Sequence, residues 1–294
     1  MDKPTASGSK AGKMLKLLIK IAVSVLCLWY VSRKIDFSAA GTALQQAAHG
    51  WLVLALLAFI LSKVFSSIRL NLYFRDIGLG LSEANNLRLY WLGMFYNLFL
   101  PGSISGDAYK VILLSKRYQL PYKKTSAAVL LDRLSGLLGL GLILMVYAGL
   151  VLRPLWMALV VAAGAIGAVA VLYFIISKWL PDFKRSFLPT LLWGIVVQGM
   201  QVICVYFILK ALHLQEHQQE YVFLFLVSSM VAVLPLTIGG LGIREVVFLE
   251  GAAYLSLAAE QAVLISLIFY LITLFTSAWG LLYIFREPIR DTQK

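Results

Sequence analysis

Residues 100–110 read LPGSISGDAYK, a turn of Pro, Gly and Ser that is followed by an acid and a base. The chain on both sides of this turn is strongly apolar. Pro lacks a backbone N–H and Gly favours turns, so the stretch predicts a break in a helix. Inside a membrane, such a break is tolerated only where protein or water surrounds the freed backbone groups. The turn therefore predicts a polar cavity.

The composition places this turn in a membrane protein. Of the 294 residues, 61% are hydrophobic and only 14% are charged. Several apolar runs approach or exceed the ~20 residues that cross a bilayer. We therefore predict an all-α polytopic membrane protein. The formal net charge of +12 fits basic cytoplasmic loops, so we expect no nucleic-acid partner.

The apolar runs divide into long and short stretches. Two short stretches, residues 87–100 and 106–118, flank the first turn, and two others, 221–236 and 243–257, flank a second turn at 237–240. A helix of 14 residues reaches only about 21 Å, short of the ~30 Å hydrocarbon core. We predict that each short pair forms a re-entrant helical hairpin. Six full transmembrane helices are predicted at residues 15–31, 51–67, 125–152, 155–176, 187–209 and 258–285.

The basic residues orient this topology. With the N-terminus in the cytoplasm, 18 basic residues fall on the cytoplasmic side and 4 outside. We predict a basic cytoplasmic tail over residues 1–14, a single transmembrane domain over 15–286 and a cytoplasmic tail over 287–294, in the cell (cytoplasmic or inner) membrane. Replacing either hairpin by two full spans would leave this count unchanged, so the charges leave that alternative open.

The spacing of the elements indicates an internal repeat. Pro101 and Pro235 are 134 residues apart, and Trp51 and Phe187, which open equivalent spans, are 136 apart. We predict one repeat over about 15–152 and a second over 155–286. Each unit crosses the membrane an odd number of times, so the second is inverted. Inverted repeats with interrupted helices are typical of transporters whose site lies near the midplane.

Polar residues gather at these turns and in the span that follows the first one. A serine can cap the helix that begins near Gly106, whose N-terminus is a natural seat for an anion. Glycines in the second turn let the backbone approach a ligand closely. The candidate substrate-binding residues are Asn97, Ser103, Ser105, Asp107, Lys110, Asp132, Arg133, Gly239, Gly240, Arg244 and Glu245.

These residues admit two interpretations. The bases suit a phosphate or a carboxylate, and the acids can balance them, meet an ammonium or carry protons. Alternatively, they only form ion pairs that lock helices, such as Asp107 with Lys110; for Asn97, cavity lining and hairpin locking are equally open. Asp132 and Arg133 are adjacent and cannot share one helix face. Lys63 and Arg69 are expected to snorkel from the cytoplasmic end of the second span.

Other motifs carry little weight. HLQEH (213–217) matches a metalloprotease pattern, but it falls in a short polar loop, and no His or Cys accompanies the central charges. GSKAGK (8–13) lacks the spacing of a phosphate-binding loop. We therefore expect no metal, no cofactor and no ATP-driven or enzymatic chemistry in this chain.

Three stretches carry a resemblance to a known family: GMFYNLFLPGSISGDAYK (93–110), LLDRLSGL (130–137) and PLTIGGLGIREVVFLEG (235–251). They resemble the lysylphosphatidylglycerol synthase transmembrane-region, or flippase-like, family, over nearly the whole chain. The sequence departs in type at Lys110, where Arg is common, and at Asp132, where Glu is common.

The resemblance implies movement of a lipid between the leaflets. In the lysyl-lipid synthases, a cytosolic aminoacyl-transferase domain follows this module. Because the chain ends nine residues after Phe285, we expect a stand-alone module that moves a lipid made by a separate enzyme. The expected function is a flippase for a phosphate-bearing, anionic or aminoacylated, phospholipid headgroup. The alternatives are a small-anion transporter, an intramembrane lipid-modifying transferase and an accessory subunit.

Overall fold

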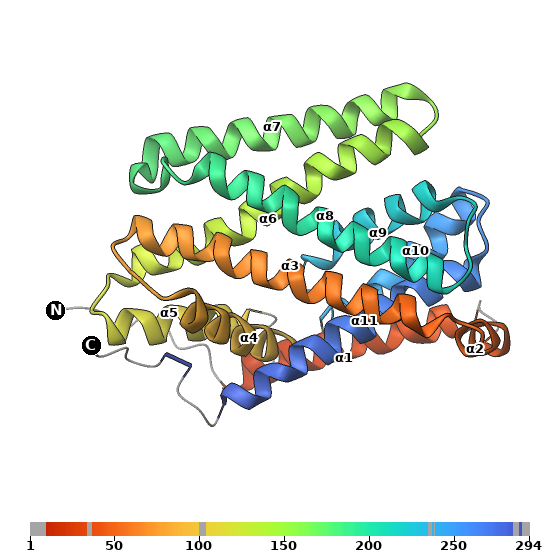
Figure 1. Cartoon of the computed structure of the whole chain (residues 1–294), viewed down its shortest axis with the longest axis horizontal. Helices are drawn as coiled ribbons and strands as arrows, with labels where there is room; N and C mark the ends of the chain where they lie inside the picture. Colours follow the sequence, from red (N-terminus) through yellow and green to blue (C-terminus); the bar gives the residue numbers. More distant parts are fainter. Residues whose placement is uncertain are drawn as a thin grey trace.

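The computed structural model describes residues 10–33, 37–99, 104–234, 237, 239–284 and 288–289, and every regular element in these ranges is helical (Figure 1). The predicted all-α class is confirmed. Five elements are long and apolar enough to cross a membrane. They are α3 (His49–Asp76), α6 (Tyr122–Val151), α7 (Leu155–Trp179), α8 (Phe187–Ala211) and α11 (Ala259–Ala278), which continues into the 3-10 turn η2 (Trp279–Tyr283).

The first predicted span lies within α1 (Lys10–Ser32), where the side chains are described only in part. The total of six spans therefore stays a prediction. Two short elements were not predicted: α2 (Phe37–Gln45), which precedes α3, and the 3-10 turn η1 (Pro181–Phe183) between α7 and α8.

Besides α2, four helices are short, and they form two pairs at opposite ends of the molecule (Figure 1). One pair is α4 (Glu83–Phe99) with α5 (Ser105–Arg117), and the other is α9 (Gln218–Ala232) with α10 (Ile243–Tyr254). At ~1.5 Å per residue they are only about 18–26 Å long. Pro101 and Pro235, in the two turns, lie outside the described residues. Re-entry of the pairs into a membrane stays a prediction.

The second predicted span was too short, because α3 continues to Asp76 instead of ending at residue 67. Arg69, Asn71 and Tyr73 of this extension are buried, and each has a partner elsewhere in the chain. Asn71 Nδ2 donates to the Leu81 carbonyl at 3.0 Å, and Tyr73 shares a 2.7 Å hydrogen bond with Thr190. As a result, Lys63 lies halfway along α3. The expectation that Lys63 snorkels from a helix end was wrong.

The two halves of the chain share one element order, a long helix, two short helices and a long helix. In the first half these are α3, α4, α5 and α6, and in the second α8, α9, α10 and α11. The two opening helices, α3 and α8, run side by side in opposite directions (Figure 1). Each closing helix packs on the other half, α6 on α8 and α9, and α11 with η2 on α3 and α4. The inverted insertion of the halves in a membrane stays a prediction.

Glycines set a close helix crossing between the halves. A Cβ atom added to Gly139 of α6 would lie 2.4 Å from the carbonyl carbon of Gly194 on α8. No real side chain fits such a gap, so the two backbones touch directly. Small residues allow this kind of contact between membrane helices. The crossing holds the cavity-bearing segments of α6 and α8 together.

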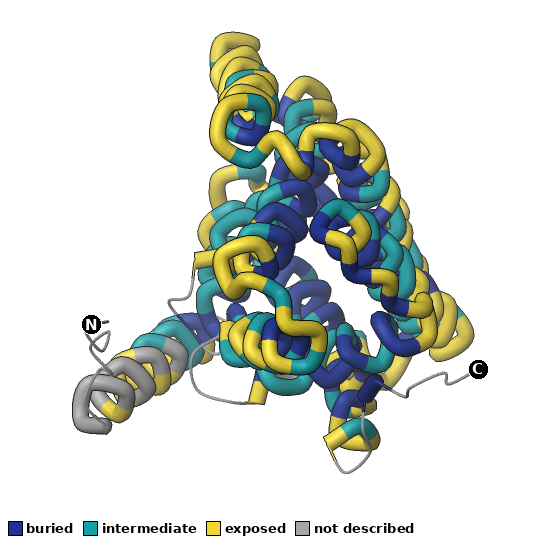
Figure 2. The backbone as a smooth tube through the Cα atoms, turned by 90° about the vertical axis from the view of Figure 1, so that its left-hand side faces the viewer, coloured by how far each residue is buried: buried dark blue, intermediate teal, exposed yellow. Residues whose placement is uncertain are grey.

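Two buried apolar clusters lie on either side of a polar middle, and burial concentrates along the centre of the bundle (Figure 2). One cluster includes Tyr73, Phe74 and Leu114, and the other includes Phe59 and Phe225. Between them, the long helices carry polar side chains near their midpoints. These are Lys63 on α3, Arg133 on α6, and Gln198 and Gln201 on α8.

The glycine crossing predicts a position-specific loss of stability. Gly139→Val should destabilise the protein by about 1–3 kcal/mol, because an added side chain overpacks the contact with Gly194. Gly149→Val on the same helix is the matched control, since an added Cβ there meets nothing within 4 Å. Thermal unfolding of the detergent-purified variants measures the difference. Equal melting temperatures for the two variants would contradict the close crossing.

Candidate functional site

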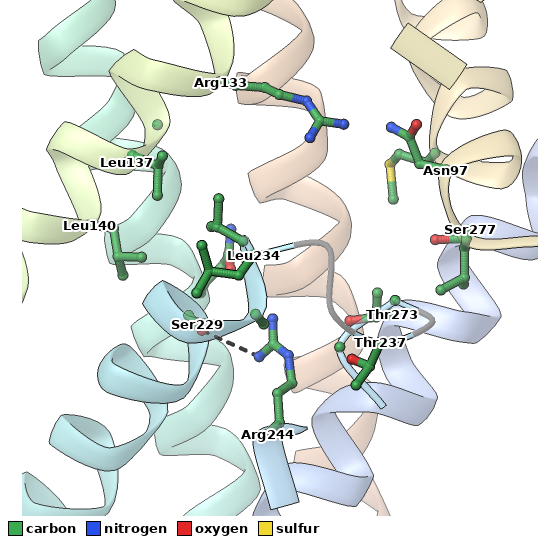
Figure 3. Close-up of a pocket in the computed structure, with 18 of the residues that line it drawn as sticks. Asn97, Arg133, Leu137, Leu140, Ser229, Leu234, Thr237, Arg244, Thr273 and Ser277 are labelled. Atoms are coloured by element: carbon green, nitrogen blue, oxygen red, sulfur yellow. Dashed lines mark hydrogen bonds between the residues drawn. The ribbon is translucent and has the colours of Figure 1, made fainter. Parts of the chain in front are cut away.

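A cavity of about 430 Å³ lies at the polar middle of the bundle. Three basic side chains line it from three helices: Lys63 of α3, Arg133 of α6 and Arg244 of α10. Figure 3 shows Arg133 and Arg244 pointing into the space from two sides. Among the described residues that line the cavity there is no Asp or Glu. The lining therefore carries an excess of positive charge.

Neutral polar groups complete the lining. Gln198 Nε2 donates to the Gly136 carbonyl at 3.3 Å, and Arg244 Nη1 donates to Ser229 Oγ at 3.3 Å. Within the described part of the chain, Gln198 Oε1 and Thr237 Oγ1 are buried without a hydrogen-bond partner. Buried polar atoms normally have partners, which can be water or a ligand. The cavity thus presents unused hydrogen-bonding groups beside its cations.

Arg133 is held by an acid from the short helix α5. Asp107 accepts a short hydrogen bond from Arg133 Nε and a second from Lys110 Nζ, at 3.2 Å. The Arg133 side chain remains 37% exposed, against 14% for Asp107 and 5% for Lys110. Asp107 therefore orients Arg133 from behind the cavity wall, and the exposed part of the pair is cationic.

Lys110 is packed between the two short helices of the first half. Its Nζ lies 4.6 Å from the centre of the Tyr90 ring. A Cβ added to Gly93 would lie 2.4 Å from Lys110 Cε, and one added to Gly106 would lie 1.9 Å from the Gly93 carbonyl oxygen. The two glycines thus let α4 and α5 meet tightly around this lysine. Lys110 does not line the cavity.

Asn97 has both of the roles left open for it. Its Oδ1 accepts a 2.9 Å hydrogen bond from the Gly106 backbone N–H at the start of α5, and the residue also lines the cavity. Ser105 Oγ donates to the Tyr96 carbonyl at 2.5 Å, which adds a second tie between α4 and α5. Locking of the helix pair and lining of the cavity are therefore compatible.

Asp132 faces away from the cavity and forms a buried ion pair with Arg69 of α3. The distance from Arg69 Nε to Asp132 Oδ1 is 2.8 Å, and the two side chains are 6% and 9% exposed. The ~100° step between adjacent helix positions sends Asp132 and Arg133 to different partners, as predicted. The expectation that Arg69 snorkels was wrong, because this carboxylate satisfies it inside the bundle.

Glu245 caps the helix from which Arg244 projects. Its Oε2 accepts the Gly242 backbone N–H at 2.6 Å, and its Oε1 accepts Ser266 Oγ at 2.8 Å. The preceding turn requires left-handed backbone at Gly239, Gly240 and Gly242, whose φ values are 60°, 85° and 88°. Both carboxylate oxygens of Glu245 therefore hold α10 in place. The guanidinium of Arg244 faces the cavity and lies 5.3 Å from the centre of the Phe269 ring.

The candidate residues therefore form two groups, those that line the cavity and those that lie behind its wall. Asn97, Arg133, Gly239, Gly240 and Arg244 line the cavity. Behind its wall lie Ser105, Asp107, Lys110, Asp132 and Glu245. Ser103 is outside the described residues.

The lining residues that sequence reasoning missed include Lys63, Gln198 and Gln201. A usable signal existed in each case. A lone Lys interrupts an apolar run, and two Gln residues spaced i, i+3 share one face of an apolar helix.

The fold and the cavity define a multi-pass helical membrane protein with an internal cationic site. The chain matches the model of the family described as lysylphosphatidylglycerol synthase TM region over residues 17–187 and 179–280, so it belongs to that family. It is also similar to a UPF0104 membrane protein of Pyrococcus horikoshii, with 22% identity over an alignment of 309 positions that spans 86% of this chain and 90% of the relative. The resemblance read from the sequence is confirmed.

The buried Arg69–Asp132 pair predicts non-additive stability. Asp132→Leu alone should destabilise the protein by about 3–5 kcal/mol, because it leaves Arg69 buried without its carboxylate. The double change Arg69→Met with Asp132→Leu should recover most of that loss, since no buried charge remains. Thermal unfolding of both variants measures the pair. A double variant as unstable as the single one would show that the charges are not coupled in this way.

Proposed function

We propose that this protein moves a phospholipid between the two leaflets of a bilayer by taking its phosphate-bearing headgroup into the cationic cavity. The main support is the composition of the cavity lining. It includes Lys63, Arg133 and Arg244, and no acidic residue is among its described members. Arg and Lys are the side chains best suited to phosphate, through charge-assisted hydrogen bonds. A headgroup in this site exchanges its water for fixed donors.

The uncharged lining supports a lipid over a free anion. Ile104, Val233 and Leu234 line the cavity, and these residues are 56%, 44% and 54% exposed. Large apolar side chains that are both cavity-facing and exposed mark a lateral opening toward lipid. Through such an opening, the acyl chains stay outside the cavity while the headgroup enters it. A soluble anion needs no apolar doorway.

The predicted topology supplies a route to both leaflets. In this proposal six spans surround two re-entrant pairs, α4 with α5 and α9 with α10, which enter from opposite sides in inverted repeats. Rocking of one half against the other would expose a midplane site alternately to each side. Both termini are cytoplasmic, in the cell membrane. The protein acts as a transporter, not an enzyme, and receives its lipid from a separate lipid-synthesising enzyme.

Reorientation of a headgroup-labelled fluorescent phosphatidylglycerol in proteoliposomes tests the proposal. Arg244→Ala, Arg133→Ala and Lys63→Ala should each slow reorientation about 10- to 100-fold, since each removes a charge-assisted contact worth about 1.5–3 kcal/mol. Arg153→Ala and Lys123→Ala are matched controls, because both residues are exposed and neither lines the cavity.

Three outcomes would contradict the proposal. They are a wild-type rate equal to that of empty liposomes, full activity in all three cavity variants, or equal losses in the two controls. A parallel assay with free phosphate inside the liposomes distinguishes transport of a lipid phosphate headgroup from transport of a free phosphate ion. Release of free phosphate without lipid reorientation would assign the site to a soluble anion.

A further inference from the structure

A second hollow lies beside the cationic cavity, between α6 and the peripheral helix α7. Its volume is about 450 Å³. Every described residue that lines it is apolar or glycine, and none is charged or polar. We refer to this hollow as the α6–α7 groove. It differs from the cavity in chemistry, since nothing in it can hold a headgroup.

The α6–α7 groove adjoins the cationic cavity. Leu137 of α6 lines both spaces. Met230 near the end of α9 lines the groove, while Val233 and Leu234, which directly follow α9, line the cavity. One molecule can therefore occupy both spaces by passing over Leu137 and the end of α9.

Small residues make the room for this groove. A Cβ added to Gly164 of α7 would meet nothing within 4 Å, and one added to Gly141 of α6 would meet only Ala165 and Met230, at 3.8 and 3.9 Å. Only 11% of the apolar window of α7 is buried, so this helix adds little to the core (Figure 2). Helix α7 forms the outer wall of the groove.

The groove is long enough to hold one lipid tail. The α7 residues that line it run from Val161 to Ile175, which at 1.5 Å per residue is about 21 Å. One leaflet of a ~30 Å hydrocarbon core gives each acyl chain about 15 Å. An extended acyl chain therefore fits along the groove.

We propose that the α6–α7 groove holds an acyl chain of the same phospholipid whose headgroup enters the cationic cavity. The inference rests on the proposed function and adds to it that the substrate is recognised by its tail as well as its phosphate. The tail does not remain loose in the bilayer during headgroup transfer. Instead, it lies in the apolar α6–α7 groove, next to the opening of the cavity at Val233 and Leu234.

Photolabelling locates the tail directly. The probe is phosphatidylglycerol with a diazirine on one acyl chain, incorporated into proteoliposomes of the whole chain, and the labelled peptides are mapped by mass spectrometry. Label should concentrate on α6 and α7 residues of the groove, and Gly164→Leu should lower it about tenfold as the added side chain displaces buried methylene contacts. Gly167→Leu is the matched control, because it adds the same side chain to α7 in open space outside the groove.

The possible outcomes are distinct. Label spread evenly over the exposed apolar surface, including Leu159 and Ile166 of α7, would show surrounding bilayer lipid only and overturn the inference. Equal labelling in the Gly164→Leu and Gly167→Leu variants would overturn it as well. A groove closed by a second copy of the chain would appear as a dimer that excludes the probe, and this result would also overturn the inference.

Transport separates this inference from the proposed function. If wild-type protein reorients lipid and Gly164→Leu does so at the Gly167→Leu rate, the groove is not a tail site while the function stands. If groove labelling is specific but wild-type protein moves no lipid, the tail site stands and the function fails.

Discussion

The arrangement of this protein follows from one electrostatic constraint: basic side chains lie in the middle of an apolar helical bundle, with lipid as the outer solvent. Lys63 and Arg133 lie near the midpoints of long helices, and Arg244 lies at the start of the short helix α10. An isolated charge at that depth costs about 2.5–3.5 kcal/mol on insertion scales. Lys63 and Arg244 have no carboxylate beside them on the described cavity lining, and Arg133 shares one that lies behind the wall. The fold reduces this cost by enclosing a polar cavity between two apolar clusters, in which water or an anion can contact the charged side chains.

The acids around the site are placed so that the cavity stays cationic. Asp132 is committed to Arg69, Glu245 caps α10, and Asp107 holds Arg133 and Lys110 from α5. Each acid thereby positions a helix or a base without entering the cavity. The two short helix pairs are the elements that gain most from this, since their ends meet the cavity and need fixed partners for backbone groups. The structural ion pairs and the cationic cavity lining are therefore two parts of one network, although the sequence presents ion pairing and ligand binding as rival interpretations.

The sequence predicted what depends on composition and local chemistry, and failed where packing decides. Apolar runs located the long helices, and the turn residues located both short pairs. The 100° step correctly separated Asp132 from Arg133. The end of α3 was misjudged because Arg69, Asn71 and Tyr73 look like an aqueous segment until their partners on other helices are known. That error moved Lys63 from the centre of a helix to its edge and hid it from the site. No pattern in one sequence shows which buried polar residue a distant helix will satisfy.

The central claim is that the cavity is a seat for a phospholipid headgroup, and the lipid that copurifies with the protein tests it most directly. The wild-type protein and a Lys63→Ala, Arg133→Ala, Arg244→Ala triple variant are purified in the same detergent, and bound lipid is quantified by mass spectrometry. Wild-type protein should retain an anionic phospholipid that withstands prolonged washing and that the triple variant lacks. Identical lipid in both preparations would contradict the account.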